Sequence, residues 1–162
     1  MTLETVRSKP AGLPSTDLPP IVFIPAGAED IDRLVDLKVA VMRGQLERLG
    51  RYTPERAREK FVARFSPERT RLIDLDGRFA GCVTVTDHGA HVEIEHLYLT
   101  PACHGSGLGS RIMGVLMDEA RALGKPIRLT VLNGSPANRF YQRLGFVETE
   151  RDPIDIQYIW TP

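Results

Sequence analysis

Two glutamates, Glu93 and Glu95, stand two residues apart in a stretch with the composition of a β-strand. Side chains alternate between the two faces of a strand, so both glutamates are expected to share one face with Leu97 and Leu99. A carboxylate beside apolar neighbours can have a raised pKa that suits a general base, which makes both glutamates candidates for proton transfer. In this register His96 falls on the opposite face and is expected to pack there, unless a β-bulge re-aims it.

A second group of residues suits the binding of an anion. Gly105, Gly107 and Gly109 lie between this predicted strand and a predicted helix whose apolar face extends from Leu108 to Leu123. Without Cβ atoms the loop backbone can approach a phosphate closely, and the first N–H groups of the helix point toward that ligand. A pyrophosphate is therefore the expected ligand, and a tight loop without a ligand is the alternative.

Two other phosphate-binding motifs do not fit the same loop. A dinucleotide fingerprint starting at Gly105 would need glycine or alanine at Ser110, and no Gly-Lys-Ser or Gly-Lys-Thr sequence follows. A nucleotide-binding oxidoreductase is thus a weaker interpretation.

The elements around these groups alternate in a way that is typical of an α/β domain. Asp76-Gly77 separates two strand-like runs and predicts a tight hairpin, because both residues tolerate positive φ. The other predicted elements are a strand from Ile21, a helix entered through Glu29 to Asp32, a helix over Thr53–Phe65, and a final strand over Ile154–Trp160. We expect one α/β domain with a mixed sheet over residues 21–162, preceded by a proline-rich arm, residues 1–20.

Composition narrows the class of partner. Lys plus Arg and Asp plus Glu are equal, at 21 each, so the chain lacks the basic excess typical of nucleic-acid and membrane-surface binders. Its two cysteines are too few for a disulfide framework, and no apolar run is long enough for a membrane span. We expect a cytoplasmic enzyme that acts on a small molecule.

The glycine loop and the strand before it resemble a known motif. The sequence Leu97-Tyr-Leu-Thr-Pro, followed by His104-Gly-Ser-Gly-Leu-Gly, is similar to motif A of the GNAT superfamily of acetyl-CoA-dependent N-acyltransferases. His104 stands where the family usually has Arg or Gln, while Gly107 and Gly109 match. The resemblance assigns the diphosphate to this loop and the pantetheine arm to the strand backbone. The implied cofactor contacts are Leu97, Tyr98, Leu99, His104, Gly105, Ser106, Gly107, Leu108, Gly109 and Ser110.

The segment from Val131 to Phe146 resembles motif B of the same superfamily. Tyr141 stands where the family commonly has a tyrosine beside the cofactor sulfur, so the resemblance implies that it assists the departing thiolate. An Asn in the preceding loop is also implied to contact the cofactor, and Asn133 and Asn138 compete for that role. The order and separation of the two motifs are more specific than either motif alone.

The resemblance implies both a fold and an activity. The fold is a mixed, mostly antiparallel sheet that splays at two parallel strands and carries about four helices. The activity is direct transfer of an acetyl group from acetyl-CoA, without a metal, to a primary amine of a small molecule, with a protein amino group as the variant. Glu95 is preferred as the base because it lies nearer the implied thioester; Glu93, His96 and water are alternatives. A non-catalytic acyl-CoA sensor is the alternative function.

The acceptor pocket is expected between the first two helices. That region is rich in arginine, which suits an acidic group on the acceptor, although a solvated helix face is the simpler interpretation. The residues concerned are Arg43, Arg48, Arg51, Tyr52 and Arg56. The same resemblance implies a homodimer. Cys103 is not expected to be a nucleophile, because it lies at the phosphate end of the implied cofactor.

Overall fold

The structure is a computed structural model that describes residues 18–162. The strands are β1 (Ile21–Pro25), β2 (Thr70–Leu75), β3 (Arg78–Asp87), β4 (Val92–Leu99), β5 (Ile127–Leu132), β6 (Val147–Arg151) and β7 (Asp155–Trp160). The helices are α1 (Ile31–Arg48), α2 (Pro54–Arg64), α3 (Leu108–Leu123) and α4 (Ala137–Arg143), with 3-10 turns at Ala28–Asp30, Pro67–Arg69 and Pro101–Cys103. Most of the predicted arm lies outside the described residues. None of the helices within residues 18–162 has the length and apolar character that crossing a membrane requires.

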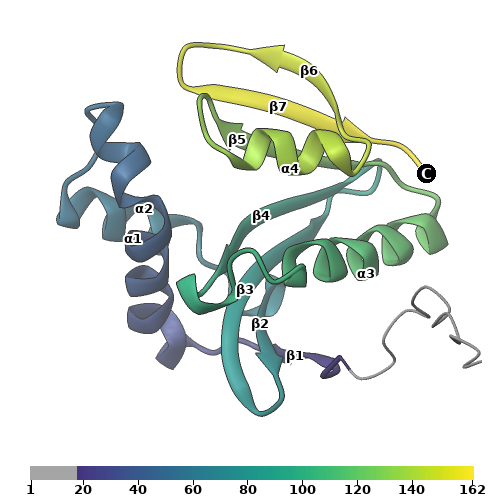
Figure 1. The fold of residues 1–162 in the computed structure, drawn as a ribbon, viewed down its shortest axis with the longest axis horizontal. Coiled ribbons are helices and arrows are strands. Elements are labelled where there is room, and N and C mark those ends of the chain that lie inside the picture. The colour runs from purple at the N-terminus through teal and green to yellow at the C-terminus, as the bar shows by residue number, and fades with distance from the viewer. Residues whose placement is uncertain (1–17) are drawn as a thin grey trace, which may run out of the picture.

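The seven strands within residues 18–162 form one mixed sheet in the order β1-β2-β3-β4-β5-β7-β6. Every neighbouring pair is antiparallel except β4 and β5, which are parallel. The parallel pair is joined only at Val92 with Ile127 and at Glu93 with Arg128, after which the two strands separate. The predicted fold class is therefore confirmed, including the splay at the parallel pair (Figure 1).

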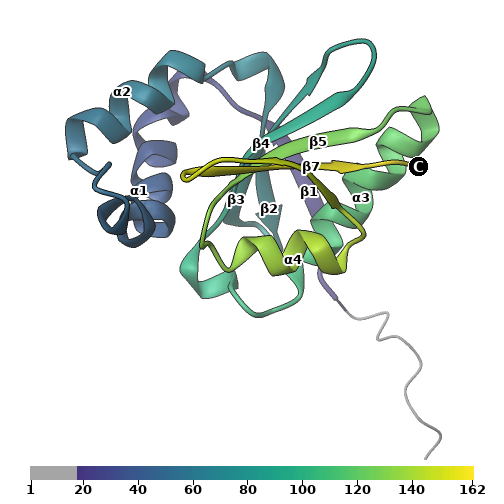
Figure 2. The same ribbon diagram turned by 90° about the horizontal axis from the view of Figure 1, so that it is seen from above.

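Helices cover both faces of the sheet and produce two separate cores. The larger core includes Ile112, Met113 and Leu116 of α3 and Tyr141 of α4, packed on one face. The smaller core includes Leu34 of α1 and Phe61 of α2 on the opposite face. Figure 2 shows the same division, with α3 and α4 on one side of the strands and α1 and α2 on the other. Any ligand that enters between β4 and β5 therefore meets a different pair of helices on each face.

Local sequence preferences account for most element boundaries. The Thr53 hydroxyl accepts a hydrogen bond from the Arg56 N–H at 3.1 Å and caps α2, as Thr-Pro at a helix start predicts. Asp76 and Gly77 both have positive φ, 56° and 76°, which confirms the predicted hairpin turn. Gly124 ends α3 in the left-handed conformation. The bounds of β6 could not be predicted, because all five of its residues are exposed and the strand has no apolar face.

A β-bulge in β4 overturns the predicted side-chain alternation. Cys82 of β3 pairs with Tyr98 and Thr84 pairs with Glu95, so His96 and Leu97 together oppose one residue of β3. His96 takes the extra position with a φ of 50°.

The bulge reverses the faces of the residues that follow it. Leu97 and Leu99 pack in the α3 core, whereas Glu95 lies on the α2 side, where Arg64 contacts its carboxylate. His96 also lies on the α2 side, since its ring centroid is 5.0 Å from that of Phe61. The prediction that Leu97 and Leu99 share a face with Glu95 was wrong. His96 does not point away from Glu95 either, because the β-bulge that was the stated exception re-aims it. Period-two alternation does not continue through a bulge.

Candidate active site

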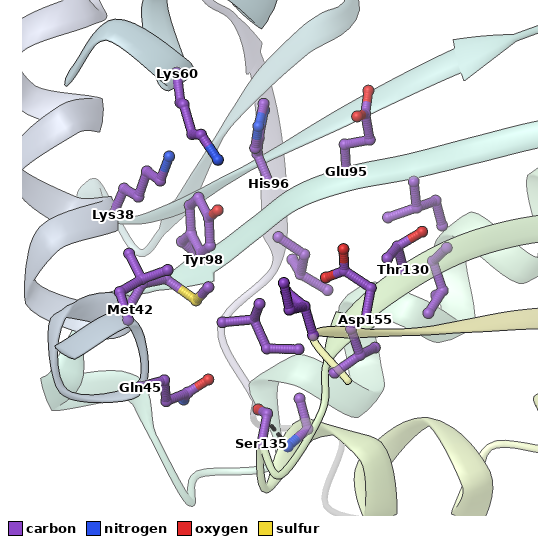
Figure 3. Close-up of a pocket in the computed structure, with 18 of the residues that line it drawn as sticks. Lys38, Met42, Gln45, Lys60, Glu95, His96, Tyr98, Thr130, Ser135 and Asp155 are labelled. Carbon is purple, nitrogen blue, oxygen red and sulfur yellow. Dashed lines mark hydrogen bonds between the residues drawn. The ribbon is translucent and has the colours of Figure 1, made fainter. Parts of the chain in front are cut away.

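A cavity of about 650 Å³ lies where β4 and β5 separate (Figure 3). Residues from both faces of the sheet line it: Leu97 and Tyr141 belong to the α3 core, and Lys38, His96 and Tyr98 lie on the α1 and α2 side. Its walls also include Glu93, Glu95, Lys60, Arg64, Gln45, Ser135 and Asp155. The cavity thus passes through the sheet at the splay, and it brings together the predicted residues Glu95 and Tyr141.

Glu95 has a carboxylate that is suited to accepting a proton. Burial raises its pKa above the ordinary value, and the like charge of Glu93 raises it further, while Arg64 opposes the shift. The side chain is 28% exposed, and its ion pair with Arg64 is long at 3.5 Å, so the carboxylate oxygens are available to a ligand. Glu93 is less free, because its Oε2 lies 2.7 Å from Nε2 of His88.

His96 lines the same cavity, but its ring is a weak base. Burial lowers the pKa of His96 to about 4, and the positive charges of Lys38 and Arg64 act in the same direction. A group with this pKa is neutral near pH 7 and has little tendency to take a proton from an amine. Of these two neighbouring groups on the α2 side of β4, Glu95 is therefore the better proton acceptor.

Tyr141 presents a protonated hydroxyl from the opposite face. The residue is 8% exposed, and its ring packs edge-on against Phe140 and Phe146. Burial raises the pKa of Tyr141 far above its ordinary value, so the hydroxyl keeps its proton. No hydrogen bond to this hydroxyl occurs within residues 18–162, which leaves it able to donate to a ligand.

The glycine loop exposes a row of backbone donors at the start of α3. Gly105 and Gly107 have positive φ, 71° and 80°, a conformation that glycine adopts without strain. Ser106 Oγ donates to the Cys103 carbonyl at 2.6 Å and holds the loop closed. Five N–H groups in and after the loop have no partner in the part of the chain that the structure describes: those of Gly105, Ser106, Gly107, Gly109 and Ser110.

Two contacts fix this loop against the strands. An added Cβ on Gly109 would lie 3.3 Å from the Phe140 ring, so glycine allows α3 to approach α4 closely. The His104 ring is exposed, and its Nε2 donates to the Leu99 carbonyl at 2.9 Å. His104 thereby ties the loop to the end of β4, next to the predicted path of the cofactor.

The two candidate asparagines are both held by the protein backbone. Asn133 Nδ2 donates to the Asp152 carbonyl at 3.1 Å. Asn138 Nδ2 donates to the carbonyls of Leu132 and Ser135, both at 2.9 Å, and its Oδ1 accepts from the Tyr158 hydroxyl at 2.8 Å. Asn138 therefore shapes the loop between β5 and α4, and its side-chain amide is already occupied on both sides.

The arginine-rich stretch of α1 and α2 contributes little to the cavity. Of its residues only Arg51 lines the wall. Arg43 pairs with Glu47 at 2.8 Å and lies over the Tyr52 ring, as expected for a solvated helix face.

Besides Arg51, the cations that line the cavity are Lys38, Lys60 and Arg64, and the sequence prediction missed these three. Lys38 offered a signal, because it stands four residues after Leu34 and four before Met42. This spacing puts it within the apolar stripe of α1.

The fold and the site together define a class of protein. A mixed sheet that splays at its one parallel pair, with a glycine loop leading into the following helix, is the arrangement expected from the motifs. A family model described as the acetyltransferase (GNAT) family matches residues 36–146, which is more than half of the chain. The chain belongs to this family.

Individual relatives agree with the family assignment. The chain is 35% identical over 68 residues to an L-methionine sulfoximine/L-methionine sulfone acetyltransferase of Salmonella typhimurium, and the match spans 40% of each chain. Among solved structures, the PaiA N-acetyltransferase of Thermoplasma acidophilum in complex with coenzyme A superposes with a TM-score of 0.70. That likeness, at 17% identity, covers 88% of this chain and 99% of the other.

A larger protein contains the same fold as one part of its chain. The N-acetylglutamate synthase of Neisseria gonorrhoeae, complexed with coenzyme A and N-acetyl-glutamate, superposes with a TM-score of 0.58 at 21% identity. The likeness covers 87% of this chain and 35% of the other. At these identities the two structures establish the shared fold.

Proposed function

We propose that the protein is an N-acetyltransferase that transfers the acetyl group of acetyl-CoA directly to a primary amine. The observation that carries the proposal is the cavity at the splay, where Glu95 and Tyr141 reach one space from opposite faces of the sheet. This arrangement allows an acyl donor to approach from the α3 face and an acceptor to approach from the α2 face.

The residues around the loop fit the donor. Unpartnered N–H groups beside α3 suit a diphosphate. The edge of β4 beyond Glu93 has no strand of the described chain beside it to pair with. We therefore assign the diphosphate to residues 104–110 and the amide-containing arm to Leu97, Tyr98 and Leu99. Asn133 and Asn138 remain proposed contacts, with Asn138 acting mainly by shaping its loop.

Each proposed catalytic group has one task. Acetyl-CoA supplies the acetyl group as an activated thioester. Glu95 accepts a proton from the amine, whose nitrogen forms the new bond to the acetyl carbon as the carbon–sulfur bond breaks. The departing thiolate takes up a proton from solvent and Glu95 releases its own, so the products are the amide and the CoA thiol. Tyr141 donates a hydrogen bond from its hydroxyl to the sulfur as it leaves. This assistance is modest, because a thiol with a pKa of about 8.5 is already a tolerable leaving group.

The acceptor is proposed to be a small molecule. A volume of about 650 Å³ falls within the range of small-ligand sites, about 300–1,000 Å³. A protein amino group is the variant within the same reaction class. The metal-independent reaction, the cytoplasmic location and the homodimer stay predictions.

Binding and turnover test the proposal separately. CoA and acetyl-CoA should each raise the melting temperature of the protein, because a ligand selective for the native state stabilises it by mass action. Thiol release from acetyl-CoA, measured across a panel of primary amines, should then identify an acceptor. Stabilisation by acetyl-CoA without thiol release from any amine would favour the sensor, and no stabilisation at saturating cofactor would contradict both functions.

A further inference from the structure

Lys38 is a nearly buried cation without an anionic partner among the residues that the structure describes. It is 9% exposed and stands on the core-facing side of α1. Its hydrogen bond is a long one, 3.4 Å from Nζ to the Ala57 carbonyl, and it forms no ion pair within residues 18–162. An ammonium has three donors, and burying its charge is costly unless the charge is paired. The protein therefore bears a cost at this position that a bound anion would offset.

Two further cations stand on the same wall. Lys60 and Arg64 of α2 also line the cavity. Burial of the Lys38 ammonium lowers its pKa, and the positive charges of Lys60 and Arg64 lower it further. Arg64 has Glu95 as a distant partner at 3.5 Å, whereas Lys60 has no ion pair among the described residues. In Figure 3 the side chains of Lys38 and Lys60 converge beside His96 and Tyr98. Mutual repulsion between the two lysines would be relieved by a negative charge between them.

The strand side of the cavity includes acidic side chains. Asp155 and Glu95 lie across from the two lysines (Figure 3). Gln45 Oε1 is buried and has no hydrogen-bond partner within residues 18–162, so it offers an acceptor to a donor group on a ligand. The cavity is thus basic at the α1 and α2 end and acidic at the strand end. A molecule with both an amine and an acid would satisfy both ends.

We propose that the acceptor is a small amino acid, in the broad sense of a primary amine that also bears a carboxylate. Lys38 and Lys60 bind the carboxylate, while the amine is directed toward Glu95. Gln45 accepts a hydrogen bond from the acceptor. This inference rests on the proposed function, whose acceptor class it specifies.

Matched acceptors provide the kinetic test. Thiol release would be measured with a panel of α-, β- and γ-amino acids, each compared with its own primary amide, which keeps the amine and removes the negative charge. Charge-assisted hydrogen bonds contribute about 1.5–3 kcal/mol, so kcat/KM for the preferred acid should exceed that for its amide by about 10- to 100-fold. In Lys38→Met and Lys60→Gln this ratio should fall toward one, while the KM for acetyl-CoA stays unchanged. Arg56→Gln is the matched control, because Arg56 is an exposed cation of α2 that does not line the cavity.

A binding measurement separates this inference from the proposed function. In the presence of CoA, the preferred amino acid should raise the melting temperature of the native protein and of Arg56→Gln, and should do so much less in the two lysine variants. Lys38→Met should itself fold with at least native stability, since it removes an unpaired buried charge. If no amine is acetylated, the proposed function fails. A rise in melting temperature with amino acids that is lost in the two lysine variants would still support the anion site. Equal use of acids and amides, or equal stabilisation in all variants, would overturn the inference.

Discussion

Replacing Glu95 by Gln should remove the general base and leave the shape of the cavity intact. General bases contribute about 10²- to 10⁴-fold to rate. We expect the lower end of this range, a decrease in kcat of about 100-fold, because the side chain is 28% exposed and water can partly substitute for it. The fold should be preserved, since the ion pair lost with Arg64 is long, at 3.5 Å, and exposed pairs contribute little.

The pH dependence of kcat tests the same assignment, because the direction of each change can be predicted. The carboxylate form of Glu95 is required, so kcat should be full above its pKa and fall as the pH drops through it. Burial and Glu93 raise this pKa, which places the fall at a higher pH than for an exposed glutamate. Glu93→Gln removes the like charge and should move the fall to lower pH, whereas Arg64→Gln removes an opposing charge and should move it to higher pH.

The assay is thiol release at saturating acetyl-CoA and acceptor, measured across the acidic range for the native protein and the three variants. Saturation matters because kcat reports groups in the bound complex and excludes titration of the free amine. A Glu95→Gln protein with nearly native kcat, or an acidic limb that survives in it unchanged, would refute the assignment. Shifts of the limb in the same direction for Glu93→Gln and Arg64→Gln would refute the electrostatic reasoning.

Three other predictions concern single residues. Tyr141→Phe should lower kcat only about tenfold, since the thiolate leaves readily. Its melting temperature should stay nearly native, since the Tyr141 hydroxyl has no partner in the described chain. An unchanged kcat would exclude the role of Tyr141. Gly107→Ala should cost about 1–2 kcal/mol in stability, because φ is 80° there, and should raise the KM for acetyl-CoA. In the native state a thiol reagent should modify Cys103 and spare Cys82, which is fully buried and has a pKa raised to about 12; denaturation should expose both, and rapid native labelling of Cys82 would contradict its burial.

Elements with strong local signals could be predicted from the sequence. The apolar stripe of α3, the Asp76-Gly77 turn and the capped start of α2 are each determined by residues close together in the chain, so the structure reproduces them. The glycine loop belongs to the same group, because its positive φ angles are a property of the glycines themselves. The family resemblance then supplied the splay, which no local pattern in β4 or β5 reveals.

The cluster of Lys38 and Lys60 at the cavity depends instead on tertiary packing. Lys38 and Lys60 are far apart in sequence and meet only because α1 and α2 pack together over the open end of the splay. The arginines between them looked equally suitable in the sequence, but the helix geometry turns Arg43 and Arg56 outward. Charge counts along a helix therefore could not identify the cavity-facing cations, whereas a lysine within an apolar stripe could have done so.

The bulge at His96 had one unrecognised sequence signal, which also explains what the bulge accomplishes. Gly81 lies in the middle of β3, and a Cβ added there would come within 2.1 Å of the Tyr98 carbonyl oxygen. Glycine inside a strand often marks such a close approach. With Gly81 accommodating the displaced backbone, β4 places Glu95 and His96 on the α2 side while Leu97 returns to the α3 core. The same short segment can then present a carboxylate to the acceptor on one face and an apolar, unpaired edge to the donor on the other. In a regular strand His96 would lie on the α3 side and Leu97 on the α2 side, so the contacts with donor and acceptor would be separated less completely. The bulge therefore allows one strand to contact both substrates.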